Sequence, residues 1–227
     1  MKILEKIKKV KKRALVPWEP FFKEKITKII KDKKNILDIG GSLRISPNKG
    51  NRLNPDMRWI ADMIRQNSVD YKIMDVVPDY NPDIVGDIHN MPFADNSLDA
   101  IICMAVLEHI ENPIKACDEL YRTLKPGGYC LAQAPFLFYY HPEKGYYNDY
   151  WRFTPDSFKM LFKKFSYFEI HNIRGAFAAW LHLSPLGRIK VFAIAANLMD
   201  KLFEKTNSNQ ASGFTVFLIS EVVCLTT

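Results

Sequence analysis

After residue 35 the chain alternates short apolar runs with amphipathic segments. The apolar runs have the length of β-strands and lie at 36–39, 71–75, 83–85, 98–104, 129–134, 167–173 and 213–225. The amphipathic segments place apolar residues at helical spacing and lie at 55–66, 112–124, 155–165 and 186–203. The run 98–104 is almost continuously apolar, which is typical of a parallel strand covered on both faces. This alternation predicts an α/β fold with a mostly parallel sheet.

The first 34 residues have a different pattern. Ile3, Ile7, Val10 and Ala14 recur at helical spacing among lysines and arginines, and residues 21–31 form a second short helical pattern. Counted from the sequence, residues 1–34 carry 13 basic and 4 acidic side chains, a net charge of +9. We therefore expect a basic N-terminal helical arm at 1–34 and one domain at 35–227. Residues 1–15 either contact an anionic membrane surface or pack their apolar stripe on the domain.

Charge and composition narrow the class of protein further. Residues 35–227 carry 19 basic and 21 acidic side chains, a net charge of −2, so a uniformly basic nucleic-acid-binding domain is not expected. Apolar types make up 48% of the chain, which fits a globular protein with a core. The four cysteines form no CxxC pair, and no apolar run approaches the roughly 20 residues of a membrane span. We expect a cytoplasmic protein, which is peripheral at the inner face of the membrane in the case that the arm contacts that surface.

Acidic and small residues stand where predicted strands end. The first strand is followed by Gly40, Gly41 and Ser42, and the second ends in Asp75. Ligands of open α/β sheets bind at the carboxyl ends of the strands, where glycine lets the backbone approach closely. A carboxylate at Asp75 suits a ribose diol. Asp87 suits an exocyclic amine, and the next residue, an isoleucine, can pack on a purine ring.

Several motifs follow one another in a characteristic order: ILDIGGS at 36–42, Asp75, GDIHNMPF at 86–93, SLDAIICMAVLEHI at 97–110 and LKPGG at 124–128. This set resembles the class I S-adenosylmethionine-dependent methyltransferases. The resemblance implies a Rossmann-like, seven-stranded sheet with an antiparallel last strand and helices on both faces. It also implies S-adenosyl-L-methionine as the cofactor. The cofactor-binding residues it implies are Asp38, Gly40, Gly41 and Ser42 near the methionine, Asp75 and Val76 at the ribose, Asp87 and Ile88 at the adenine, and Met104 and Ala105 near the sulfonium.

Two features depart from the family pattern. Ser42 replaces the usual third small glycine of the first loop, where its hydroxyl could donate to the cofactor carboxylate. Asp38 and Asp75 are 37 positions apart, longer than the roughly 20 residues typical of nucleotide-binding βαβ units. We therefore expect an additional loop within residues 46–69.

Methyl transfer from a sulfonium mainly requires alignment of donor and acceptor, and a hydroxyl acceptor also benefits from a general base. His141 is the first candidate for that base and His109 the second, with Asp149 orienting the ring of His141. In a ubiquinone-pathway branch of the family, a Glu-x-x-Glu-His pattern is associated with a divalent metal. Glu108 and His109 match the last two residues of this pattern. Here Ala105 replaces the first glutamate of that pattern, so we expect no metal.

Aromatic residues gather after the fifth predicted strand. Nine of the 29 aromatic residues of the chain lie within 134–153. We expect this segment to form the acceptor pocket, with Tyr140, Tyr146, Tyr150 and Arg152 as substrate-binding residues. We expect Trp151 and Phe153 to be core anchors that tether this loop. For Arg152, a structural ion pair is the alternative interpretation.

The HP…DYWRFTP pattern within 141–155 resembles a segment of methyltransferases of bacterial cell-surface glycan synthesis. This resemblance favours O-methylation of a sugar or glycan intermediate. Methylation of a small quinone, phenol or amine, and a catalytically silent cofactor-binding protein, are the two alternatives.

Overall fold

The computed structural model describes residues 18–49, 53–206 and 209–221. Seven strands form one sheet in the order β3-β2-β1-β4-β5-β7-β6. Their bounds are β1 (Asn35–Ile39), β2 (Asp70–Asp75), β3 (Ile84–Val85), β4 (Leu98–Met104), β5 (Leu124–Pro135), β6 (Tyr167–Asn172) and β7 (Gly213–Ile219). β7 runs antiparallel to both β5 and β6, and the other pairings are parallel. The predicted fold class is confirmed.

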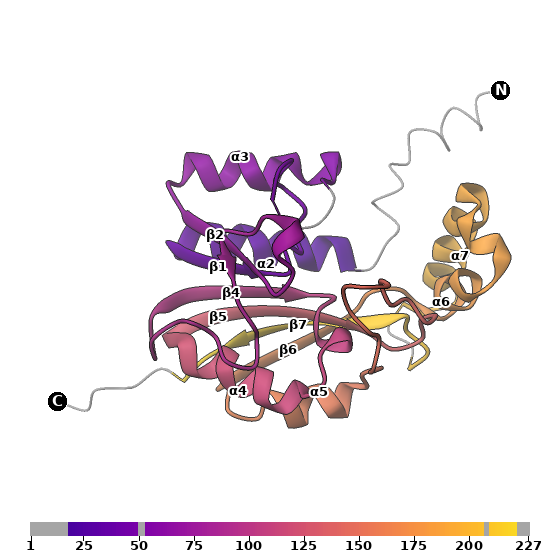
Figure 1. Ribbon diagram of the computed structural model, residues 1–227. Helices are drawn as coiled ribbons and strands as arrows, with labels where there is room; N and C mark the ends of the chain where they lie inside the picture. Colours follow the sequence, from indigo (N-terminus) through magenta and orange to yellow (C-terminus); the bar gives the residue numbers. More distant parts are fainter. Residues whose placement is uncertain (1–17, 50–52, 207–208, 222–227) are drawn as a thin grey trace.

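Helices cover both faces of the sheet (Figure 1). α2 (Trp18–Asp32) and α3 (Arg58–Gln66) lie on one face, and α4 (Pro113–Thr123) and α5 (Pro155–Leu161) on the other. Each face has its own apolar cluster, and the strands contribute alternate side chains to the two clusters. Short 3-10 turns occupy η2 (Pro55–Met57), η3 (Pro78–Tyr80), η4 (Leu107–His109) and η5 (Pro185–Arg188).

Helix α2 corrects the boundary expected at residue 34. Its apolar face buries Phe21, Phe22, Ile26, Ile29 and Ile30 against the sheet. The helix is therefore part of the core of the domain and not of a separate arm. Residues 1–17, which hold the first predicted helix, lie outside the described residues.

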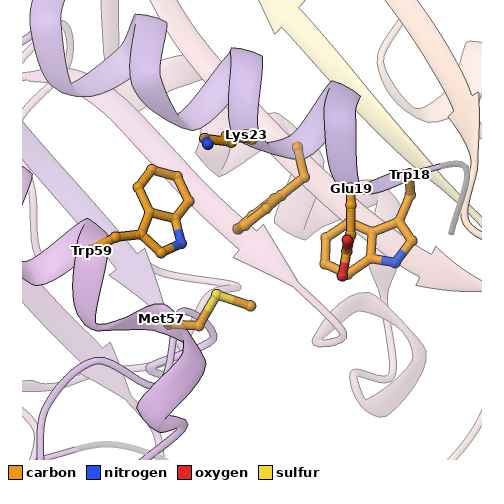
Figure 2. Close-up of a pocket in the computed structure, with 6 residues that line it drawn as sticks. Trp18, Glu19, Lys23, Met57 and Trp59 are labelled. Atoms are coloured by element: carbon orange, nitrogen blue, oxygen red, sulfur yellow. The ribbon is translucent and has the colours of Figure 1, made fainter. Parts of the chain in front are cut away.

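Aromatic side chains lie between α2 and the η2–α3 segment that follows β1. A small cleft of about 80 Å³ between α2 and the η2–α3 segment is lined by Trp18, Phe22, Met57 and Trp59 (Figure 2). The ammonium of Lys23 lies 5.9 Å from the centre of the Trp59 ring. The helix predicted at 55–66 is confirmed as η2 followed by α3, with the Asn54 side chain accepting from the Asp56 amide at its start.

The connection between β6 and β7 holds a pair of helices, α6 (Ala176–Leu183) and α7 (Lys190–Leu202), at one end of the sheet (Figure 1). One helix at 186–203 was predicted, and α6 was not, because its sequence AFAAWLHL is nearly all apolar and shows no helical period. An apolar cleft of about 680 Å³ lies against the pair, lined among others by Leu137, Phe177 and Phe192. Among the described residues, no helix combines the length and apolarity needed to cross a bilayer.

Candidate active site

The order of the sheet places a cleft where ligands of such folds bind. β1 pairs with β2 on one side and with β4 on the other. Successive strands are therefore added on one side of β1 up to β3 and on its other side from β4 onward. A cleft of about 340 Å³ opens at their carboxyl ends. Five of the predicted cofactor-binding residues line it: Gly40, Asp75, Val76, Asp87 and Ile88.

Gly40 forms the floor of this cleft and has a backbone that favours glycine. Its φ of +74° lies in the left-handed region, and a Cβ there would come within 2.9 Å of Val106 Cγ2. Its amide donates to the carbonyl of Met74 at 2.8 Å, which holds the loop to β2. A side chain at position 40 would therefore push Val106 into the cleft.

Two carboxylates stand on the cofactor side of the cleft. Asp75 is buried at the end of β2, where Oδ1 accepts from the amide of Val77 at 2.9 Å, and burial raises the pKa of its carboxyl. Asp87 Oδ1 accepts from the amide and from Nδ1 of His89, at 2.8 and 2.7 Å. Partial burial opposes ionisation of Asp87, but the bonds from His89 outweigh it and hold its pKa below the usual range. Both groups are hydrogen-bond acceptors suited to ribose hydroxyls or an exocyclic amine.

Asp38 and Ser42 lie behind the cleft and not on its surface. Asp38 is completely buried and accepts from the amide and hydroxyl of Ser42, the amide of Leu43 and the hydroxyl of Tyr71, at 2.9, 2.5, 3.0 and 2.5 Å. Burial raises the pKa of its carboxyl. The Ser42 hydroxyl is thus donated to Asp38, and this pair orders the loop after β1.

Three further predicted cofactor residues are also absent from the cleft lining. Gly41 is buried beside Gly40, and the side chain of Met104 belongs to the core cluster on the α2 face. Ala105 has a left-handed backbone with a φ of 55°, which turns the chain at the end of β4. Val106, which sequence reasoning did not single out, faces the cleft in their place.

Residues 136–153 form the opposite wall, here called the acceptor segment. Its ends meet, because the amide of Phe153 donates to the carbonyl of Pro135 at 2.8 Å. The amides of Tyr150 and Trp151 donate to the carbonyl of Glu108 at 2.7 and 3.2 Å, and Trp151 Nε1 donates to the carbonyl of Ile110 at 2.9 Å. The segment is therefore tied to the loop after β4, and the interpretation of Trp151 as an anchor agrees with these contacts.

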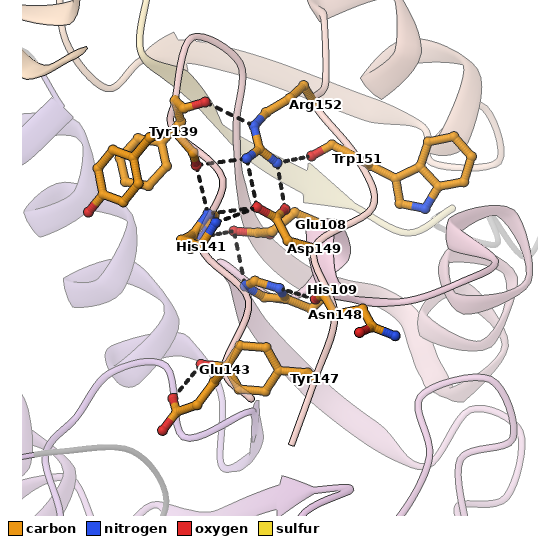
Figure 3. Close-up of polar contacts among 11 residues, drawn as sticks. Glu108, His109, Tyr139, His141, Glu143, Tyr147, Asn148, Asp149, Trp151 and Arg152 are labelled. Atoms are coloured by element: carbon orange, nitrogen blue, oxygen red, sulfur yellow. Dashed lines mark hydrogen bonds and ion pairs between the residues drawn. The ribbon is translucent and has the colours of Figure 1, made fainter. Parts of the chain in front are cut away.

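Asp149 and Arg152 form the centre of the acceptor segment (Figure 3). The Asp149 side chain has no solvent exposure and binds Arg152 through both oxygens, at 2.6 and 2.7 Å. Arg152 also donates to the carbonyls of Phe138, Tyr139 and Trp151. The guanidinium lowers the pKa of Asp149 to about 2. Arg152 was predicted to bind substrate, but these contacts fit the alternative of a structural ion pair.

Two histidines predicted as candidate bases lie side by side, with ring centres 4.9 Å apart. His109 Nδ1 is 2.7 Å from the carbonyl of Asn148. His141 Nδ1 is 3.0 Å from Asp149 Oδ2 and 3.1 Å from the carbonyl of Tyr139. Carbonyl and carboxylate oxygens only accept, so each Nδ1 is a donor, and in the neutral ring each Nε2 is therefore an acceptor.

Both Nε2 atoms face Glu108. They lie 4.0 Å (His109) and 3.9 Å (His141) from Glu108 Oε1 (Figure 3). Glu108 is 1% exposed, and its Oε2 has no hydrogen-bond partner among the described residues. Burial raises the pKa of Glu108 to about 8 and lowers that of His109. The sequence offered Glu108 only as the remnant of a metal pattern, because its approach to His141 depends on the fold.

The predicted substrate-binding tyrosines differ in position. Tyr146 and Tyr150 line the main cleft, together with Tyr147 and Asn148, which were not predicted. Tyr146 stacks on Tyr80 with ring centres 5.4 Å apart. Tyr140 is 73% exposed and lines a shallow neighbouring cleft. The richness of the segment in aromatic residues was the signal from which Tyr147 could have been selected.

The chain is similar to known methyltransferases in both sequence and fold. Residues 55–132 match the family model described as a methyltransferase domain. An uncharacterized methyltransferase of Schizosaccharomyces pombe is 43% identical over 54 residues, 23% of this chain and 19% of that protein. A demethylmenaquinone methyltransferase of Paenarthrobacter aurescens is 49% identical over 45 residues, 20% of this chain and 18% of that protein. The chain thus spans about a fifth of the length of these curated relatives.

Among solved structures, a SAM dependent methyltransferase from Archaeoglobus fulgidus superposes with a TM-score of 0.55 at 13% identity. The match covers 88% of this chain and 94% of that one. At this identity the likeness concerns the fold, while the family model concerns the sequence of the segment from η2 to β5. The chain therefore carries a methyltransferase-domain segment within the fold of the S-adenosylmethionine-dependent methyltransferases.

Proposed function

We propose that this protein is an S-adenosylmethionine-dependent methyltransferase that methylates a hydroxyl group of a sugar or glycan intermediate. One observation carries the proposal: a single cleft has the strand-end carboxylates Asp75 and Asp87 on one wall and the aromatic acceptor segment on the other. The methyltransferase-domain match over residues 55–132 supports the donor. The aromatic and hydrogen-bonding side chains of the acceptor segment support a hydroxyl-bearing acceptor.

In this proposal Asp75 accepts from the ribose hydroxyls and Asp87 from the adenine amine, with Ile88 against the purine ring. Gly40 lets the backbone approach the methionine part of the cofactor. Asp38 and Ser42 lie behind the cleft, where their hydrogen bonds to one another fix the loop that carries Gly40.

Calorimetric titration with S-adenosylhomocysteine tests the donor site. Asp75→Ala and Asp87→Ala each remove a charged acceptor, so we expect each to weaken binding by roughly tenfold or more. Asp95→Ala is the matched control, because that carboxylate pairs with Arg122 outside the cleft. Equal affinities in all four proteins would exclude the proposed donor site.

The base in this proposal is His141. Its Nδ1 is held by Asp149, so Nε2 is free to accept the hydroxyl proton as the methyl group transfers. His141→Ala is expected to lower turnover by about 10²–10⁴-fold and to leave S-adenosylhomocysteine affinity nearly unchanged. A screen of nucleotide-sugar and lipid-linked acceptors with labelled donor identifies the substrate for this measurement. Near-normal turnover of His141→Ala would pass the role to His109 or to alignment alone.

A planar acceptor is the second candidate. The similarity to a demethylmenaquinone methyltransferase favours a quinone or phenol, and the exposed tyrosines of the acceptor segment suit a flat ring. The same labelled-donor screen, extended to quinones, phenols and amines, separates the two. Donor binding without transfer to any acceptor class would instead favour a silent cofactor-binding protein.

For location, we propose that residues 1–15 contact an anionic membrane from the cytoplasmic side. The support is the sequence: the basic excess of the chain lies within residues 1–34, around an apolar stripe. Such a position would place the protein at the surface where lipid-linked acceptors are found.

A further inference from the structure

Three hydrogen-bond acceptors converge beside the cleft with no donor between them. The lone pairs of His109 Nε2 and His141 Nε2 both face the Glu108 carboxylate, and one atom of each residue lies within 4.8 Å of the others. Glu108 Oε2 is buried and has no partner among the described residues. Burying three unpaired acceptors costs folding free energy unless a positively charged group occupies the space between them.

We propose that Glu108, His109 and His141 bind a divalent first-row transition-metal cation such as Zn²⁺. Two imidazole nitrogens and one carboxylate oxygen are a common ligand set for these metals, and a cation bound by three protein ligands keeps a position open for substrate or water. His109 also lines the cofactor cleft, so that open position faces the proposed reaction space.

The surroundings of the histidines match those of metal-bound imidazoles. Metal-ligating histidines usually donate their second N–H to a carbonyl or carboxylate, which fixes the ring and its tautomer. His109 donates to the carbonyl of Asn148 and His141 to the carboxylate of Asp149. Asp149 is itself held by two bonds from Arg152. Both nitrogen ligands are thus oriented before any cation arrives.

The spacing requires only a small contraction. Ligands at about 2.0–2.1 Å around a tetrahedral zinc ion lie roughly 3.3 Å from one another. The separations of 3.9 and 4.0 Å from Glu108 Oε1 exceed this by less than 1 Å, which side-chain rotation can supply. The side chains of His109 and His141 are 11% and 26% exposed, so a cation can enter from the cleft.

This site replaces the expectation of no metal, which rested on Ala105 standing where a glutamate ligand was sought. The fold brings His141 from a distant segment as the third ligand. The inference rests on the proposed function only for the identity of the cleft. With a cation bound, His141 Nε2 would be a ligand and no longer the base of the proposed function. The cation would instead lower the pKa of the acceptor hydroxyl, whose proton would pass to water.

Cation binding is measured directly on the untagged full-length chain, by titration calorimetry with Zn²⁺ and by the visible absorption of bound Co²⁺. We expect one cation per chain and a Co²⁺ spectrum of low coordination number. Glu108→Gln and His141→Ala should each weaken Zn²⁺ binding by more than tenfold, and Asp149→Asn by about 10–100-fold, as is typical for loss of an outer-shell partner. His171→Ala, a histidine on β6 outside the cluster, should bind like the unmodified chain.

S-adenosylhomocysteine affinity, measured on the same samples, separates the two proposals. Retained donor binding with no stoichiometric Zn²⁺ binding would overturn the metal site alone. Equal Zn²⁺ binding by the unmodified chain, Glu108→Gln and His141→Ala would also overturn it, since the cation would then lie elsewhere.

Discussion

At the scale of single residues, Asp149 is the side chain on which the acceptor wall most depends. It joins Arg152 to His141 and has no solvent exposure. Asp149→Asn leaves the partly exposed guanidinium of Arg152 without its anion, so we expect a loss of about 1.5–3 kcal/mol of unfolding free energy at neutral pH. Urea unfolding of both proteins measures it. Asp156→Asn, at an exposed pair with Lys159, is the control and should change little.

The same carboxylate gives stability a defined pH dependence. The pKa of Asp149 is about 2 in the folded chain, below the value of about 3.9 in an unfolded one. A depressed folded pKa stabilises the protein above the unfolded value, and this contribution disappears as the pH falls toward 2. The difference between the unmodified chain and Asp149→Asn should therefore shrink between about pH 4 and pH 2. A constant difference across that range would show that Asp149 does not act through its charge.

Residue-scale predictions from sequence agree with the structure where the end of a strand fixes the position of a residue. Asp75 lines the cleft because it is the last residue of the parallel strand β2. Asp87 lines it because it comes two residues after the parallel strand β3. Asp38 looks equivalent in sequence, but the hydroxyl of Tyr71 on the neighbouring strand completes its hydrogen bonds and removes it from the surface. Glu108 and His141 lie close together only because tertiary packing brings their two segments into contact. The spacing of these residues in the sequence could not predict this.

At the scale of elements, α2 is the helix whose removal has the largest consequence. Its five buried apolar side chains contribute roughly 1.5–3 kcal/mol each, a sum comparable with the ~5–15 kcal/mol stability of a whole domain. A chain beginning at Trp18 should unfold cooperatively, whereas one beginning at Lys33 should not fold. Circular dichroism during thermal unfolding distinguishes the two. Cooperative unfolding of the shorter chain would restore the boundary expected at residue 34.

Elements with a clear period were predicted well, and those without one were not. Helix α4 was predicted at 112–124 and spans Pro113–Thr123, because its apolar residues recur every three to four positions. β5 begins at Leu124 and not at 129, since Leu124 pairs with Leu98 of β4 before a shift in register, after which Tyr129 pairs with Ala100. α6 was missed because a short, wholly apolar sequence is compatible with either a strand or a helix.

At the scale of the whole molecule, charge is concentrated at one end of the sequence. If residues 1–15 bind membranes, the full chain should sediment with anionic vesicles at low salt and release them as salt rises, since basic residues near such a surface contribute roughly 1 kcal/mol each. A chain lacking residues 1–15 should remain in the supernatant with unchanged S-adenosylhomocysteine affinity. Neutral vesicles provide the control. Equal sedimentation of both chains would assign the contact to the domain itself.

The hydrogen bond between Pro135 and Phe153 has a consequence for how proteins of this fold diversify. The acceptor segment leaves and re-enters the domain at nearly one point, so its length and sequence can change while β5 and α5 stay in place. Lengthening a loop between fixed ends costs little, because closure entropy grows only with the logarithm of its length. Evolution, or a protein engineer, can therefore graft a foreign loop at these two residues without rebuilding the wall that carries Asp75 and Asp87.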